Sequence, residues 1–83
     1  MVEAQNIKKI SEFKDNTLLI VDDDNPFRER LSRAMEKKGF QVSQAESVKK
    51  GKESVKLNKP AFAVVDLRLN DGNGLEVVKD IQL

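Results

Sequence analysis

The chain has 83 residues, with 39% hydrophobic and 35% charged residues, so it is at most one small domain with a thin core. It contains no cysteine and no histidine, which excludes disulfides, Cys/His zinc sites and Ser-His-Asp catalysis. A net charge of +1 does not indicate a nucleic acid or membrane surface as a partner. The apolar runs are too short to cross a membrane, and the start lacks the apolar core of a signal peptide. We therefore expect a cytoplasmic protein.

Residues 1–15 are polar, with apolar side chains at Ile7, Ile10 and Phe13. This spacing fits either a short helix packed on the domain or a frayed tail. We treat residues 1–15 as an N-terminal extension and residues 16–83 as the domain.

The first predicted strand is the apolar run "TLLIV" at residues 17–21, which suits a strand buried on both faces. Asn25 followed by Pro26 predicts a helix N-cap and its first helical residue. Gly39 is expected to end this helix. One face of the helix carries Phe27, Leu31, Ala34, Met35 and Lys38.

The second predicted strand, residues 40–44, alternates apolar and polar side chains like a half-exposed edge strand. Ser47 can cap a second helix, which Gly51 weakens and which residues 58–60 end. The side chains expected to face inward from this helix are Val48, Val55 and Leu57.

The third predicted strand is "AFAVV" at residues 61–65, followed by a turn and a helix over residues 75–83. This helix is expected to direct Leu75, Val78 and Ile81 inward. The alternation of strands and helices predicts an α/β fold with a doubly wound parallel sheet and right-handed crossovers. We expect the strand order 2-1-3.

Acidic residues follow two of these strands: Asp22, Asp23 and Asp24 after the first, and Asp66 after the third. With the order 2-1-3, the loops after the first and third strands border a crevice at the carboxyl ends of the strands. Crowded carboxylates repel each other unless a cation intervenes, and a small set of oxygen ligands suits Mg²⁺. A carboxylate beside Mg²⁺ can attack a phosphoryl group. We expect Asp22, Asp23 and Asp66 to form such a site.

Each acidic stretch also fits a simpler interpretation when taken alone. "DDDN" is common in solvated loops and helix caps, Asp66 can cap a strand, and "NDGNG" is ordinary turn chemistry. The site is favoured because each acidic group stands at the matching end of its strand.

The stretches "LLIVDDDNPFRERL" and "VVDLRLNDGNG" resemble the receiver domain of two-component response regulators, over residues 16–83. The resemblance is greatest to the global redox regulators that carry a C-terminal helix-turn-helix domain. It implies a flavodoxin-like fold, a sensor histidine kinase as partner and a transcriptional regulator as the parent protein.

The resemblance also implies roles for single residues. Asp66 would be the phospho-acceptor, Asp23 a direct Mg²⁺ ligand, and Asp22 a ligand directly or through water. The backbone carbonyl of Arg68 would be a further ligand. Gly74 matches the family glycine that turns the loop into the third helix, while Asn70 stands where many members have proline.

The sequence departs from the family after the third strand. A receiver has five β/α units, and this sequence matches two and the start of a third. It lacks the family's switching Ser/Thr, its phosphate-binding Lys, its signalling face and a DNA-binding domain, which puts phosphorylation of Asp66 in this chain in question. An aspartyl-phosphate phosphatase would need an acid/base aspartate where Arg68 stands, so we do not expect an enzyme.

The third strand would then be an apolar, unpaired sheet edge, which invites pairing with another chain. We expect a homo-oligomer formed through this edge or by exchange of elements. The alternative function is an oligomerisation or interaction module without phosphotransfer. In neither case do we expect this chain to contact nucleic acid.

Overall fold

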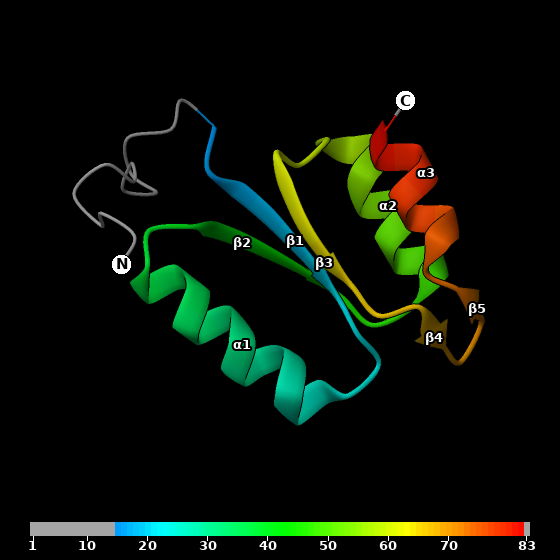
Figure 1. Cartoon of the computed structure of the whole chain (residues 1–83), viewed down its shortest axis with the longest axis horizontal. Coiled ribbons are helices and arrows are strands. Elements are labelled where there is room, and N and C mark those ends of the chain that lie inside the picture. The colour runs from blue at the N-terminus through cyan, green and yellow to red at the C-terminus, as the bar shows by residue number, and fades with distance from the viewer. Residues whose placement is uncertain (1–14, 83) are drawn as a thin grey trace, which may run out of the picture.

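The computed structural model describes residues 15–82. The predicted N-terminal extension therefore lies outside the described residues except for Asp15. The elements, labelled in Figure 1, are β1 (Thr17–Val21), α1 (Asn25–Lys37), β2 (Gln41–Ala45), α2 (Val48–Leu57), β3 (Phe62–Val65), β4 (Arg68–Leu69), β5 (Gly72–Asn73) and α3 (Leu75–Gln82). Within these residues, no helix has the length and apolar character needed to span a membrane.

The main sheet is three-stranded and parallel with the order β2-β1-β3, which confirms the predicted topology. β1 is the central strand, and its last residue, Val21, is paired with Ala45 of β2 and Val65 of β3. α1 covers one face of the sheet, and α2 and α3 lie together on the other (Figure 1). The carboxyl ends of all three strands consequently meet at one edge.

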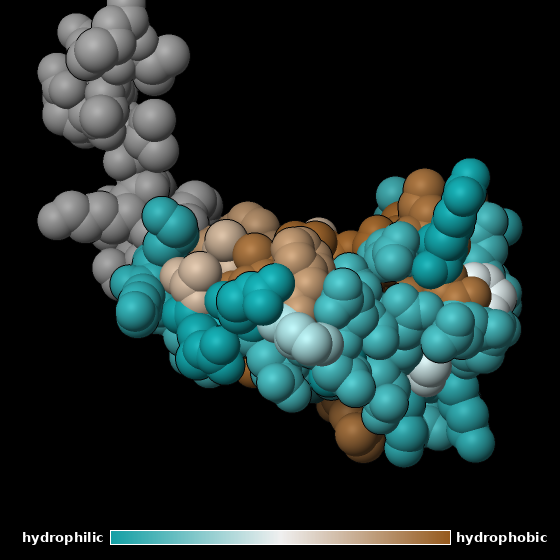
Figure 2. Space-filling model, turned by 90° about the horizontal axis from the view of Figure 1, so that it is seen from below, coloured by the Kyte–Doolittle hydropathy of each residue, from teal (hydrophilic) through white to brown (hydrophobic). Residues whose placement is uncertain are grey.

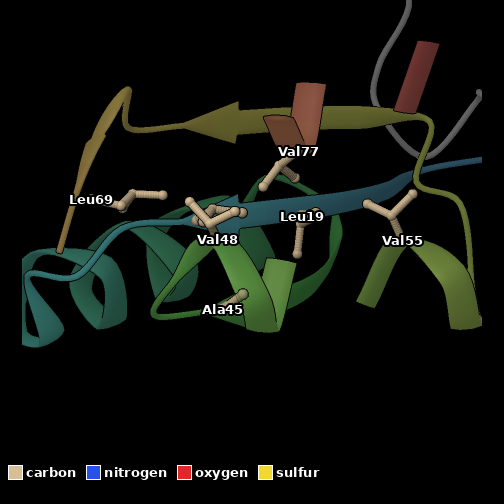
Figure 3. Close-up of a cluster of buried hydrophobic side chains, with 7 residues drawn as sticks. Leu19, Ala45, Val48, Val55, Leu69 and Val77 are labelled. Carbon is tan, nitrogen blue, oxygen red and sulfur yellow. The ribbon is translucent and has the colours of Figure 1, made fainter. Parts of the chain in front are cut away.

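The larger core lies between the sheet and the pair α2 and α3. Figure 3 shows these side chains directed toward one another from the sheet, the two helices and β4. The buried cluster consists of Leu19, Val21, Ala45, Val48, Val55, Leu69 and Val77. Because side chains alternate along a strand, Leu18 and Ile20, which are also buried, lie on the face that α1 covers.

The start of α1 differs from the prediction by one residue. Asp24 is the N-cap, and its carboxylate accepts a hydrogen bond of 3.1 Å from the Phe27 amide. The prediction of Asn25 as the cap is therefore wrong. Asp and Asn cap equally well, so residue preference alone could not decide between neighbours.

The inward face of α1 was also predicted wrongly. Its buried residues are Arg28 and Ser32, whereas Phe27 is 43% exposed. Of the predicted stripe, Leu31 and Met35 are half-buried, and Ala34 and Lys38 are exposed. The reason is a polar contact with β2: Arg28 Nε donates to Gln44 Oε1 at 2.9 Å.

In α2, Val48 and Val55 are buried as predicted, but Leu57 is 88% exposed and its predicted inward position is wrong. Gly51 is buried where α2 approaches its neighbours. A Cβ there would lie 3.0 Å from Cγ2 of Val77 and 3.3 Å from Cγ2 of Val21. The glycine weakens helix propensity, but its missing side chain lets α2 pack closely on α3 and β1.

In α3, the fully buried residue is Val77, whereas Leu75, predicted to face inward, is 45% exposed. Val78 and Ile81 are half-buried. The helix packs against both α2 and β3. Its inward face is therefore centred on Val77 and not on the predicted stripe of Leu75, Val78 and Ile81.

Within the described residues, β1 is the strand that pairs with β3, which places β3 at the edge of the sheet. Ala63 and Val64 are exposed, Val64 at 45%. Near the start of the strand, the rings of Phe62 and Phe40 pack edge to face with centroids 5.4 Å apart. The predicted exposed edge is therefore present in residues 15–82.

Two leucines test how much of the stability comes from this core. Leu19 is 1% exposed and Leu57 88% exposed. We expect Leu19→Ala to lower the free energy of unfolding by about 2–5 kcal/mol, because it leaves a cavity in the central strand. Leu57→Ala should change it by less than about 0.5 kcal/mol. Urea unfolding followed by circular dichroism measures both, and equal effects would contradict the packing described.

Candidate metal centre

Three carboxylates meet at the carboxyl edge of the sheet. Asp22 and Asp23 follow β1, Asp66 follows β3, and one oxygen from each lies within 4.8 Å of the others. All three residues are half-buried. The structure thus brings together the three aspartates that the strand order predicted, although they are far apart in the sequence.

Backbone hydrogen bonds continue past the strand ends and fix where these aspartates begin. The Asp66 amide donates to the Val21 carbonyl at 2.9 Å, and the Asp22 amide donates to the Ala45 carbonyl at 3.0 Å. The Cα positions of Asp22 and Asp66 are therefore set by the sheet itself. They do not depend on attraction between the side chains, which carry like charges.

Each carboxylate of the cluster accepts one hydrogen bond from a nearby backbone amide. Asp22 Oδ1 accepts from Asp24 at 2.9 Å, and Asp66 Oδ1 accepts from Arg68 at 3.1 Å. Asp23 Oδ2 accepts from Asn70, across the crevice, at 3.1 Å. These bonds orient the side chains and each uses only one oxygen of its carboxylate.

Neither of the two ion pairs found in residues 15–82 involves this cluster. The donor set is three carboxylates at a half-buried edge, and hard divalent cations prefer such oxygen ligands. The cluster therefore fits a cation of the Mg²⁺ or Ca²⁺ type. The ligand role expected for the Arg68 carbonyl stays a prediction; the contact seen for Arg68 is its amide bond to Asp66.

Arg28 supports the β1–α1 loop and was missed in the sequence. Its guanidinium Nη1 donates to the Asp22 carbonyl at 2.8 Å and to Asn25 Oδ1 at 2.7 Å. Together with the bond from Nε to Gln44, these contacts hold the loop that carries Asp22 and Asp23 against β2. Nothing in the helical pattern singled out an arginine at an inward position.

The loop after Asp66 forms the small antiparallel hairpin of β4 and β5 where a simple turn was predicted. The hairpin ends at Gly74, whose amide donates to the Leu67 carbonyl at 3.0 Å. A Cβ on Gly74 would collide with the carbonyl oxygen of Asp66. The glycine is therefore required by the close approach of two backbone segments next to the acidic cluster.

Asp71, at the tip of this hairpin, is a second residue that sequence reasoning missed. Its carboxylate accepts hydrogen bonds from the amides of Val48 at 2.8 Å and Lys49 at 3.0 Å, at the start of α2. The bonds from Lys49 and then Val48 lower the pKa of Asp71 below its ordinary value. Because its pKa is lowered, this carboxylate stabilises the fold at pH values above the ordinary pKa range of carboxyl groups. That contribution is lost as the pH falls through the lowered pKa.

Comparison with known proteins agrees with this geometry. The model of the response regulator receiver domain family matches residues 18–83. The chain belongs to this family. The resemblance seen in its acidic motifs is thereby confirmed, and the chain is a receiver of two-component signal transduction over these residues.

Several curated proteins are similar to this receiver chain. The photosynthetic apparatus regulatory protein RegA of Rhodobacter capsulatus is 60% identical over 68 residues, which cover 82% of this chain and 37% of RegA. The acid tolerance regulatory protein ActR of Rhizobium meliloti is 54% identical over 68 residues, 82% of this chain and 35% of ActR. The chain thus spans little more than a third of these relatives.

A solved structure has the same fold. It is a response regulator from Burkholderia pseudomallei with a phosphorylated aspartic acid, a calcium ion and citrate. The TM-score is 0.75 at 30% identity, over 81% of this chain and 39% of that chain. The parallel sheet of order β2-β1-β3 is therefore that of a receiver.

A pair of glycines tests the close approach beside the acidic cluster. In Gly74→Ala the new Cβ meets the backbone of Asp66, and we expect the free energy of unfolding to fall by about 1–3 kcal/mol. In Gly51→Ala the new Cβ meets side-chain methyl groups of Val77 and Val21 at 3.0 and 3.3 Å instead of backbone, and helix propensity improves by about 1 kcal/mol. The Gly51 variant should therefore be the more stable of the two in urea unfolding; the reverse order would contradict the close approach at Gly74.

Proposed function

We propose that the chain is a partial receiver that binds Mg²⁺ at Asp22, Asp23 and Asp66 and accepts a phosphoryl group on Asp66. The observation that carries the proposal is the meeting of the three carboxylates, with oxygens within 4.8 Å of one another, at the ends of β1 and β3. Mg²⁺ commonly takes only one or two carboxylates from a protein and keeps waters and phosphate oxygens as its other ligands. The three aspartates are only half-buried, which suits a cation that keeps such ligands.

The chain's own contribution to phosphotransfer is a fixed nucleophile. Asp66 Oδ1 is held by the Arg68 amide, which leaves Oδ2 to attack phosphorus while the bond from phosphorus to the donor breaks. The leaving group takes the electron pair of that bond, and a carboxylate nucleophile releases no proton in the step. When bound, a divalent cation would neutralise part of the negative charge on the oxygens of the phosphoryl group.

The partner and the parent protein follow from family membership. We propose a sensor histidine kinase as the phosphoryl donor and a transcriptional regulator as the whole protein, since the similar proteins RegA and ActR are regulatory proteins. The family supports the expectation that the chain is not an enzyme. Its cytoplasmic location and the absence of nucleic acid contact stay predictions.

Charge-matched variants test the cation site. We expect Mg²⁺ to bind the wild-type chain, as measured by isothermal titration calorimetry. Asp23→Asn and Asp66→Asn should each weaken binding at least about tenfold, because each removes a charged ligand. Glu53→Gln removes an equal charge from α2, outside the cluster, and should leave the affinity unchanged.

Phosphorylation is tested separately with acetyl phosphate and mass spectrometry. Wild type should gain one phosphoryl group in the presence of Mg²⁺, and Asp66→Asn should gain none. No Mg²⁺ binding at millimolar concentration would contradict the whole proposal. Binding without labelling would restrict the function to cation binding and refute the acceptor role.

The open edge of β3 favours a second candidate function, self-association. Val64, paired with Ile20 on the α1 side of the sheet, is 45% exposed. Figure 2, in which the molecule is seen from below, shows a largely hydrophilic surface with apolar side chains in separate patches. We propose that two copies pair through the outer edge of β3 around Val64, because an apolar strand at a sheet edge offers both hydrogen-bonding groups and apolar surface.

Sedimentation at micromolar concentration tests this association. Val64→Lys should shift the chain toward monomer, because lysine on an edge strand opposes pairing. Leu57→Lys, at an exposed apolar residue of α2, should leave the association unchanged, as should Asp66→Asn. A monomeric wild-type chain, or an associated Val64→Lys chain, would contradict edge pairing.

A further inference from the structure

We propose that Asp71 is a positioning residue for the acidic cluster. It ties the β4–β5 hairpin to the start of α2 and so holds the Asn70 amide against the carboxylate of Asp23. This inference rests on the proposed cation site, because its effect is exerted on a ligand of that site.

The first half of the link joins the hairpin to α2. The two oxygens of Asp71 accept from separate amides, Val48 at 2.8 Å and Lys49 at 3.0 Å. Both bonds are within the normal range for N–H···O hydrogen bonds, and an anion at a helix N-terminus is favoured by the helix dipole. A carboxylate held at both oxygens fixes the tip of the hairpin in orientation as well as in position.

The second half joins the hairpin to the cluster. The residue before Asp71, Asn70, donates its amide to Asp23 Oδ2 at 3.1 Å. Leu69 and Gly72 on either side are paired in the hairpin, and Leu69 is buried in the core. Residues 70 and 71 therefore bridge between Asp23 on one side and α2 on the other. Figure 1 shows the hairpin beside the end of α2 that begins the helix.

α2 does not need Asp71 in order to begin. Ser47 is its N-cap, and the Ser47 side chain accepts from the Lys50 amide at 3.0 Å. Asp71 satisfies two further amides of the first turn from a distant part of the chain. Its particular effect is thus the connection between loop and helix, which Ser47 does not provide.

A connection of this kind works in both directions. If the Asp71 bonds favour the loop position that binds a cation, a bound cation must favour the Asp71 bonds by the same free energy. The amides of Val48 and Lys49 report on these bonds directly. Cation binding at the cluster should therefore slow their hydrogen exchange.

The experiment compares Asp71→Ala, Asp71→Asn and Ser47→Ala in the 83-residue chain. Asp71→Ala should weaken Mg²⁺ binding by about tenfold or more, the range for lost partners of metal ligands. Asp71→Asn keeps one acceptor oxygen and should fall between Asp71→Ala and wild type. Ser47→Ala weakens the start of α2 without touching the hairpin, so it should lower stability yet keep the wild-type affinity. Circular dichroism confirms that each variant is folded.

Hydrogen exchange of the same proteins gives the second readout. In wild type and Ser47→Ala, Mg²⁺ should slow exchange at Val48 and Lys49; in Asp71→Ala it should not. Unchanged affinity in a folded Asp71→Ala chain overturns the inference while the proposed cation site stands. Equal weakening by Ser47→Ala also overturns it, since helix stability alone would then explain the effect. A wild-type chain that binds no Mg²⁺ overturns both the proposed site and this inference.

Discussion

The parallel pairing of β1 with β3 is the constraint on which the site depends. Val21 is the last residue of β1 and lies opposite Val65, the last residue of β3. Because both strands run in the same direction and end in register, the next residues, Asp22 and Asp66, emerge at one edge of the sheet. The amide of Asp66 extends the ladder to the Val21 carbonyl. A slip of one residue would turn Asp66 to the opposite face.

The ladder has to hold these aspartates against their own repulsion. Two unit charges 4.8 Å apart, the upper limit within the cluster, repel by about 3 kcal/mol at an effective dielectric constant near 20 and by about 1 kcal/mol in water. The repulsion between these half-buried carboxylates lies between the two values. The backbone amides of Asp24, Arg68 and Asn70 offset part of this cost. A divalent cation would turn the net repulsion within the cluster into a net attraction, which is why the geometry favours a cation site.

The sequence was sufficient for the features that depend on short local runs and strand order. The ends of the apolar runs correctly predicted that Asp22 and Asp66 follow the first and third strands. The predicted order 2-1-3 then placed Asp22, Asp23 and Asp66 together. It was insufficient where a distant partner decides the outcome. Arg28 faces inward because Gln44 on β2 accepts from it, and Asp71 is fixed by amides of α2. Helical periodicity contains no information about such partners.

The two edges of β3 carry two separable properties. Its β1 edge holds Asp66 through the pairing of Val21 with Val65, so the acidic cluster needs no neighbour on the other side. On its opposite edge no strand of the described residues pairs with it, and Val64 is exposed, which is where the proposed pairing with a second chain would occur. The proposed cation site and the proposed self-association therefore depend on opposite edges of one short strand. A substitution on the outer edge can change assembly while the three carboxylates keep their positions.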